Sequence, residues 1–205
     1  DAGIPCIQIF DSPERVPPIP GPWVIKPDDG AGCADTSVVA TWQDARGWLD
    51  ARTGEGFIAQ PWCEGTPLSL SMICYPGDAL LLSCNRQHVR RRDARLDLDG
   101  ITVDALDDNQ GIYAGLAASV AAALPGLRGY VGIDMVLGES PAGGDDYVIE
   151  LNPRHTTSYV GLRAACRGNL AAELLRAAVG EIIQPRFVAN VVEFLADGQI
   201  VRGGL

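Results

Sequence analysis

Short apolar runs alternate along this chain with turns that contain proline or glycine, a pattern typical of antiparallel β-strands. In the first half, the runs predict strands over residues 23–27, 57–60, 68–75 and 79–89. The last two flank the turn signal Pro76-Gly77-Asp78 and therefore predict a hairpin. Residues 95–103 alternate polar and apolar side chains around Asp99-Gly100, which predicts a second hairpin or a wide turn at that point.

Three segments instead repeat at the helical period. The first is 41–52, with Thr41 as N-cap; the second is the alanine-rich segment 109–124. The third, 168–179, is expected to be amphipathic, with an apolar face made of Leu170, Leu174, Leu175 and Val179. Further strands are expected at 129–137 and 146–151, and as a pair over 191–201 that turns at Asp197-Gly198. The fold class predicted is α+β.

Composition limits where the protein works and what it binds. The 205 residues are 47% apolar, enough for a core in one domain or two small lobes. No apolar run approaches the roughly 18 residues of a membrane helix and no signal pattern opens the chain, so we expect a cytoplasmic protein without a membrane partner. Six scattered cysteines without a CxxC pair favour buried free thiols over zinc or redox chemistry.

A net charge of -10 argues against a nucleic-acid partner, whose backbone requires clustered Lys and Arg. The same charge disfavours a bound polyphosphate, so any phosphate site must rely on local cations, backbone amides and a divalent metal. The basic run 86–95, around His88, is either a solvated strand and turn or a site that holds an anionic substrate.

Oxygen-bearing side chains gather at two apolar strands near residues 132–136 and 148–154. Glu150 and Asn152 are two apart and share a face of the second strand, and Asp134 lies in the first. Hard oxygen donors without thiols or imidazoles are the ligands that Mg²⁺ prefers. These three residues are the candidate metal ligands; the alternative is that they are solvated acids at strand ends.

Five motifs occur in a fixed order: Val-Ile-Lys-Pro, a glycine loop, Ile-Ala-Gln followed by Glu-Gly, Gly-Ile-Asp, and Ile-Glu-Leu-Asn-Pro-Arg. In that order, across about residues 20–180, they resemble the ATP-grasp superfamily of ATP-dependent ligases. The resemblance implies two lobes with mainly antiparallel sheets that grip ATP. We therefore expect a connector over 1–19, a small lobe over 20–60 and a large lobe with the metal site over 61–205. The family's N-terminal α/β domain and a further phosphate-contacting lysine are missing from this sequence, so we expect the chain alone to bind ATP weakly.

The resemblance also implies roles for individual residues. Lys26 would contact the α- and β-phosphates, and Arg154 would stabilise the transferring phosphoryl group. Asp134, Glu150 and Asn152 would hold Mg²⁺, for which Mn²⁺ can substitute. The remaining ATP contacts would come from the glycine loop, the adenine-binding segment and a ribose contact, which are Gly30, Ala31, Gly32, Gln60, Pro61, Trp62, Cys63 and Glu64. Pro67 stands where many members carry an acidic ribose contact, which makes Glu64 the weaker assignment.

The activity expected is activation of a small-molecule carboxylate, glutamate being one candidate, as an acyl phosphate that an amine attacks. The segment 152–162 is similar to a subgroup that joins glutamate to an aromatic amine. Thr156, Thr157, Ser158 and Tyr159 there are either substrate contacts or a polar turn that opens a helix. Two other functions stay open, a degenerate ATP-binding regulatory module and a carboxylase subunit that phosphorylates bicarbonate. A homodimer is compatible with each of them.

Overall fold

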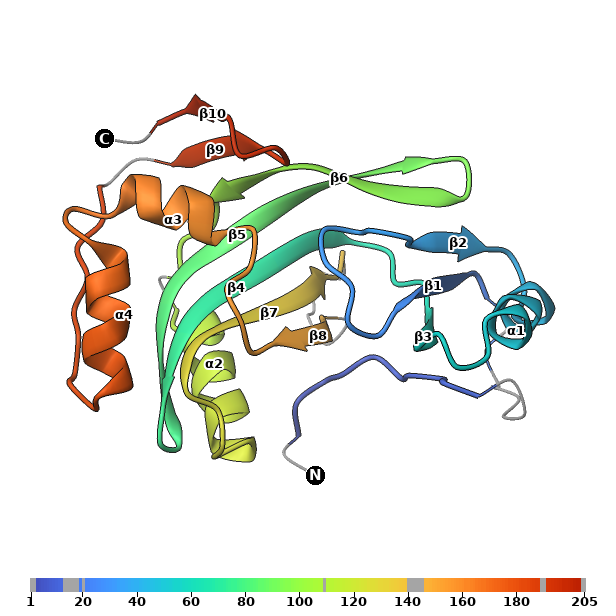
Figure 1. Cartoon of the computed structure of the whole chain (residues 1–205), viewed down its shortest axis with the longest axis horizontal. Helices are drawn as coiled ribbons and strands as arrows, with labels where there is room; N and C mark the ends of the chain where they lie inside the picture. The colour runs from blue at the N-terminus through green and yellow to red at the C-terminus, as the bar shows by residue number, and fades with distance from the viewer. Residues whose placement is uncertain are drawn as a thin grey trace. The chain divides into compact units, whose positions relative to one another are not determined.

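The computed structural model describes residues 3–12, 19, 21–108, 110–139, 146–188 and 191–203 (Figure 1). The strands in these ranges are β1 Trp23–Pro27, β2 Ser37–Val39, β3 Phe57–Pro61, β4 Thr66–Tyr75, β5 Asp78–Arg92, β6 Arg95–Val103, β7 Gly129–Leu137, β8 Tyr147–Asn152, β9 Val192–Leu195 and β10 Ile200–Arg202. The helices are α1 Trp42–Ala51, α2 Ile112–Ala123, α3 Tyr159–Ala165 and α4 Leu170–Ala178. No helix in the described ranges is long and apolar enough to cross a membrane. The α+β class is confirmed.

The chain divides into two compact units. Unit 1 contains residues 1–5, 65–88 and 100–205, and unit 2 contains residues 6–64 and 89–99. The tip of the β5–β6 hairpin thus belongs to unit 2, whereas the boundary at residue 61 expected from the sequence leaves it in the larger lobe.

Unit 2 is a small antiparallel sheet covered on one face by α1. Strand β1 lies in the middle and pairs with both β2 and β3. Helix α1 begins with a capping box, in which Thr41 accepts from the Asp44 backbone and the Asp44 carboxylate accepts from the Thr41 backbone. The core under the helix is apolar and includes two aromatic side chains: Phe10, Trp23, Ile25, Ala45, Leu49 and Ala59. Phe10 is 1% exposed and pairs with Ala59, so part of the expected connector belongs to this core.

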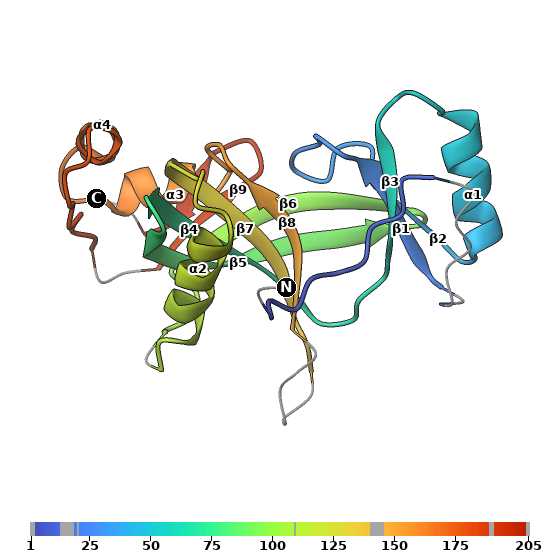
Figure 2. The same cartoon turned by 90° about the horizontal axis from the view of Figure 1, so that it is seen from below.

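Unit 1 is built on long antiparallel strands in the order β6-β5-β4-β7-β8, with β9 paired to β6 and β10 to β9. Helix α2 lies against one face of β4 and β7 (Figures 1 and 2). The core there includes Leu68, Leu70 and Met72 of β4 with Ile133 and Met135 of β7. Alternation along β4 sends its other side chains to the opposite face, where Ile73 packs with Ala177 of α4. That second face also carries the polar side chains of the candidate site.

The prediction of a turn at Asp99-Gly100 is wrong, because β6 runs unbroken from Arg95 to Val103. The turn lies instead at Asp93-Ala94, between β5 and β6, where Asp93 has a φ of 54°. Gly100 is required for a different reason: a Cβ there would lie 2.4 Å from the Phe194 carbonyl oxygen of the paired strand β9. Glycine at this position therefore reflects a close approach of two backbones and not a turn.

The predicted apolar face of the last helix is also partly wrong. In α4, Leu170 and Ala177 are buried, whereas Leu175 is 71% exposed, and Val179, just after the helix, is 78% exposed. Helical spacing alone cannot identify which of two adjacent apolar stripes faces the sheet. The other predicted strands and helices occur within a few residues of their expected bounds, although Asn109, the expected start of the second helix, lies outside the described residues. The prediction of buried free thiols is confirmed for Cys74, Cys84 and Cys166, whereas Cys6 is exposed.

Candidate active site

Asp134, Glu150 and Asn152 lie together on the second face of the unit 1 sheet. Asp134 is directly opposite Glu150 in the β7–β8 pair, and Asn152 is opposite Gly132. The Asn152 side-chain amide donates to Asp134 Oδ2 at 3.0 Å. Asn152 is 5% exposed, and the two acids are half-buried. The structure therefore brings the three predicted oxygen donors into one cluster.

A β-bulge in β8 makes this arrangement compatible with the core. Asp134 pairs with Glu150 but Met135 pairs with Val148, so Ile149 is an extra residue in β8. Strict alternation would place Val148 on the same face as Glu150. The extra residue shifts the phase, so Val148 and Leu151 both join the core under α2 while Glu150 and Asn152 stand with Asp134.

A buried neutral hydrogen-bond network lies beside these acids on the same face. Asn85 is fully buried and donates to the Ser69 carbonyl and to Ser71 Oγ, both at 3.1 Å, while its own oxygen accepts from Ser83. Ser69 also bonds Ser158, 89 residues away, at 3.1 Å. The network thus attaches the start of α3 to strands β4 and β5.

The segment that follows Asn-Pro-Arg packs on the same face. Tyr130 donates to Ser71 and bonds Thr156 at 3.2 Å, and the His155 ring stacks on Tyr130 at 5.2 Å. Burial raises the pKa of Tyr130, so this hydroxyl stays protonated as a donor. Gly132 makes the approach possible, because a Cβ there would lie 2.4 Å from Thr156 Cγ2. The glycine of the Gly-Ile-Asp motif is therefore needed for packing.

Arg154 directly follows this cluster and is exposed. Its backbone N–H donates to the Asn152 carbonyl at 2.8 Å, which turns the chain sharply after β8. The guanidinium contacts the His155 carbonyl at 3.4 Å. The predicted phosphoryl-stabilising residue thus lies in the same unit as the three oxygen donors, two residues beyond Asn152.

In unit 2, Lys26 and Gln60 share the face of the sheet that α1 does not cover. Lys26 pairs with Ile58 and Val24 with Gln60, whereas Trp23, Ile25 and Ala59 face the helix. After β1, the predicted glycine loop folds through tight turns, with bonds from Gly30 to Pro27 and from Ala34 to Ala31. Gly32 has a φ of 60° and the following Cys33 a φ of 61°. Successive left-handed residues turn the loop backbone sharply after Ala31.

The predicted adenine-binding segment, Gln60 to Cys63, lies near the end of the first of the two stretches that form unit 2. Gln60 is buried, and the Trp62 backbone N–H donates to the Pro22 carbonyl at 2.9 Å. Burial raises the pKa of Cys63, so its thiol is neutral. The Glu64 carboxylate accepts a bond from the Trp62 indole at 2.6 Å. A ribose contact by Glu64 would compete with that bond.

The basic run is engaged in ion pairs at the tip of the β5–β6 hairpin. Arg90 pairs with Asp99, and Arg92 pairs with Asp97 at 3.3 Å. His88 bonds Thr102 at 2.7 Å. These contacts support the interpretation of the run as a solvated strand and turn.

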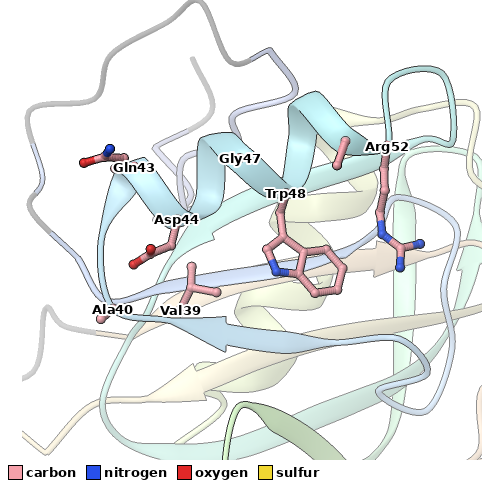
Figure 3. Close-up of a pocket in the computed structure, with 8 residues that line it drawn as sticks. Val39, Ala40, Gln43, Asp44, Gly47, Trp48 and Arg52 are labelled. Carbon is pink, nitrogen blue, oxygen red and sulfur yellow. The ribbon is translucent and has the colours of Figure 1, made fainter.

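A shallow hollow lies along α1, away from the predicted ATP-binding residues (Figure 3). The Arg52 guanidinium stands over the Trp48 ring at 4.7 Å and over Phe57 at 4.9 Å. The residues that line the hollow are Val39, Ala40, Gln43, Asp44, Gly47, Trp48, Ala51 and Arg52. None of these is a predicted site residue.

The donor set fits a hard divalent cation. Two carboxylates directly opposite each other and an adjacent amide offer only oxygen ligands, as Mg²⁺ and Mn²⁺ prefer. Among the described residues, no three His, Cys, Asp or Glu side chains form a metal cluster, and the candidate set has only two such residues. Magnesium sites that also use ATP phosphates need no more than one or two carboxylates.

The chain belongs to the ATP-grasp family, because the family model described as an ATP-grasp domain matches residues 5–158. The motifs and the α+β fold with its curled antiparallel sheet agree with this assignment. The resemblance identified from the sequence is thereby confirmed.

One relative is the tyramine–L-glutamate ligase of Methanocaldococcus fervens, 33% identical over 113 residues. The match covers 53% of this chain, and the chain spans about a third (34%) of that relative's length. An L-amino acid ligase from Bacillus licheniformis has a TM-score of 0.66 at 16% identity, over 93% of this chain and 48% of that one. The biotin carboxylase domain of a Hydrogenobacter thermophilus 2-oxoglutarate carboxylase, in complex with magnesium ADP and bicarbonate, has a TM-score of 0.70 at 16% identity. That match covers 94% of this chain and 46% of the other.

Proposed function

We propose that this chain carries the ATP- and magnesium-binding part of a ligase that joins a carboxylate to an amine. The observation that carries the proposal is the cluster of Asp134, Glu150 and Asn152 on one sheet face, in which Asn152 donates to Asp134 at 3.0 Å and Glu150 lies opposite Asp134. Membership of the ATP-grasp family supports a role of this cluster in magnesium binding, since a solved structure with a similar fold is bound to magnesium ADP.

Unit 2 supplies the groups for the nucleotide. Lys26, on the sheet face that α1 leaves uncovered, provides a positive charge for the α- and β-phosphates. Backbone amides of Gly30, Ala31 and Gly32 would bind the phosphates, as glycine-rich loops do elsewhere, with Gly30 giving up its bond to Pro27. Gln60, Pro61, Trp62 and Cys63 contact adenine, and Glu64 contacts ribose after giving up its bond to the Trp62 indole.

Unit 1 supplies the groups for phosphoryl transfer. Asp134, Glu150 and Asn152 hold magnesium, which when bound neutralises charge on the phosphates. Arg154 offsets charge that develops as a substrate carboxylate oxygen attacks the γ-phosphorus and ADP leaves. An amine then attacks the acyl phosphate, an amide bond forms, and inorganic phosphate and a proton are released.

The substrates proposed are glutamate and an aromatic amine. The relative from Methanocaldococcus fervens, at 33% identity, carries that pair in its name. An aromatic group could pack on the ring cluster that follows the Asn-Pro-Arg motif, where exposed His155 stands edge-on to Tyr159 at 4.7 Å. Thr156 and Thr157 would then lie beside the reacting groups, whereas Ser158 is buried and bonded to Ser69.

Titration calorimetry with ATP, with and without Mg²⁺, tests the nucleotide site. We expect magnesium-dependent binding by the wild-type chain, its loss in Glu150→Ala/Asn152→Ala, and weaker binding in Lys26→Met with or without metal. Glu181→Ala is the control, because it removes an exposed carboxylate of the same unit. Equal affinity with and without Mg²⁺, or no binding at all, would contradict the proposal.

Hydroxylamine trapping tests the chemistry. Incubation with ATP, Mg²⁺ and glutamate should give a hydroxamate, because hydroxylamine captures an acyl phosphate, and tyramine should suppress that product. ATP binding without any hydroxamate would favour a regulatory module. A product formed from bicarbonate alone would favour the carboxylase-type reaction.

A further inference from the structure

Gln87 contacts the candidate metal site from two strands away. Its Nε2 donates to Asp134 Oδ1 at 2.8 Å, while Asn152 Nδ2 donates to the other oxygen, Oδ2, at 3.0 Å. Asp134 is therefore held by two amides, one on each carboxylate oxygen. Two such bonds fix both the position of the carboxylate and its rotation about the Cβ–Cγ bond.

The sheet register explains how Gln87 reaches so far. Asp134 of β7 pairs with Ser69 of β4, and Ser69 pairs with Asn85 of β5. Gln87 is two residues beyond Asn85 and so shares its face. Neighbouring strands are about 4.8 Å apart, so β5 and β7 are separated by roughly 10 Å. The long side chain can span this distance because the residue between them, Ser69, is small and is bonded to Ser158.

The charge of the donor matters as much as its reach. Arg86 and Arg90 lie near Gln87 along β5, on the opposite face of the strand by alternation. An arginine or lysine in place of Gln87 would form an ion pair with Asp134 and offset the negative charge that attracts a divalent cation. The neutral amide orients the carboxylate and leaves its charge intact.

We propose that Gln87 is a positioning residue for the magnesium ligand Asp134. Its uncharged amide orients the carboxylate by a hydrogen bond and so affects metal affinity without contacting the metal. The inference rests on the proposed function, and it adds a residue that none of the sequence motifs includes. Partners of this kind, when removed, typically change metal affinity by about 10- to 100-fold.

The test measures Mn²⁺ affinity by EPR titration in the presence of saturating ADP, which avoids turnover. Gln87→Met keeps the length of the side chain and removes the donor; Gln87→Lys keeps a donor and adds a positive charge. Gln199→Met is the matched control, because Gln199 is exposed in the β9–β10 turn of the same unit. Binding of metal-free ADP and the thermal unfolding midpoint in EDTA are recorded for every variant.

We expect Mn²⁺ affinity to fall about tenfold or more in Gln87→Met and further still in Gln87→Lys, with the control unchanged. The unfolding midpoint should follow a different order, with Gln87→Lys at or above Gln87→Met, since an ion pair to Asp134 replaces the lost bond. A residue that only supports the fold would lower affinity and midpoint together. Unchanged Mn²⁺ affinity in Gln87→Met overturns the inference alone, whereas a wild-type chain that binds no Mn²⁺ with ADP overturns the proposed function as well.

Discussion

Gly132 and Thr156 approach each other so closely that the sheet has no room for a side chain at residue 132. A Cβ on Gly132 would lie 2.4 Å from Thr156 Cγ2 and 3.4 Å from Thr156 Oγ1. Gly132 is opposite Asn152 in the β7–β8 pair, and Thr156 bonds Tyr130. This contact therefore joins β7 and β8 to the segment that precedes α3.

Gly132→Ala should destabilise the protein by about 1–3 kcal/mol, because the added methyl group overpacks this contact. The double variant Gly132→Ala/Thr156→Ser should recover much of the loss, since serine lacks Cγ2 and keeps the hydroxyl that bonds Tyr130. Urea unfolding measures both. Gly115→Ala is the control: nothing lies within 4 Å of its Cβ, and α2 should gain about 0.5–1 kcal/mol. Equal stability of Gly132→Ala and wild type would contradict the expected clash.

Asn85→Leu should cost roughly 3 kcal/mol, because it leaves the Ser69 carbonyl and two serine hydroxyls without their buried partner. Ser83→Ala removes only one bond to the same amide and should cost about 1 kcal/mol. Chemical denaturation of the two variants in parallel checks the order. A leucine variant as stable as the alanine variant would mean that the network contributes little beyond its packing.

Stability should decline in alkali partly because of Cys84. Burial, with further contributions from Asp108, Asp104 and Asp107, raises the pKa of its thiol from 9.0 to about 12. The folded protein thus holds this proton more tightly than the unfolded chain. The stabilising contribution is complete below about pH 9 and is lost as the pH rises toward about 12.

Unfolding free energies of wild type and Cys84→Ala, measured from about pH 8 to about pH 11, check this expectation. The variant should lose less stability over that range than wild type. Cys6→Ala, which removes an exposed thiol, should follow wild type. Parallel curves for wild type and Cys84→Ala would exclude a role for this thiol.

Local patterns in the sequence were enough for most of the elements and for the metal-site hypothesis. Two-residue spacing places Glu150 and Asn152 on one face of a strand wherever that strand pairs, and Thr41 as N-cap predicts the start of a helix. The chemistry of oxygen donors likewise follows from residue type. The ordered motifs led to the ATP-grasp family, which the family match over residues 5–158 confirmed.

Only the tertiary structure decided which distant residues meet. Gln87 reaches Asp134 through pairing across β5, β4 and β7, and Ser69 bonds Ser158 although 89 residues separate them. The turn predicted at Gly100 is wrong because the glycine is required by the neighbouring backbone of β9. That strand lies almost a hundred residues further along the chain. A periodic pattern encodes which side of a strand is apolar, but register and neighbours follow from how all the strands pack at once.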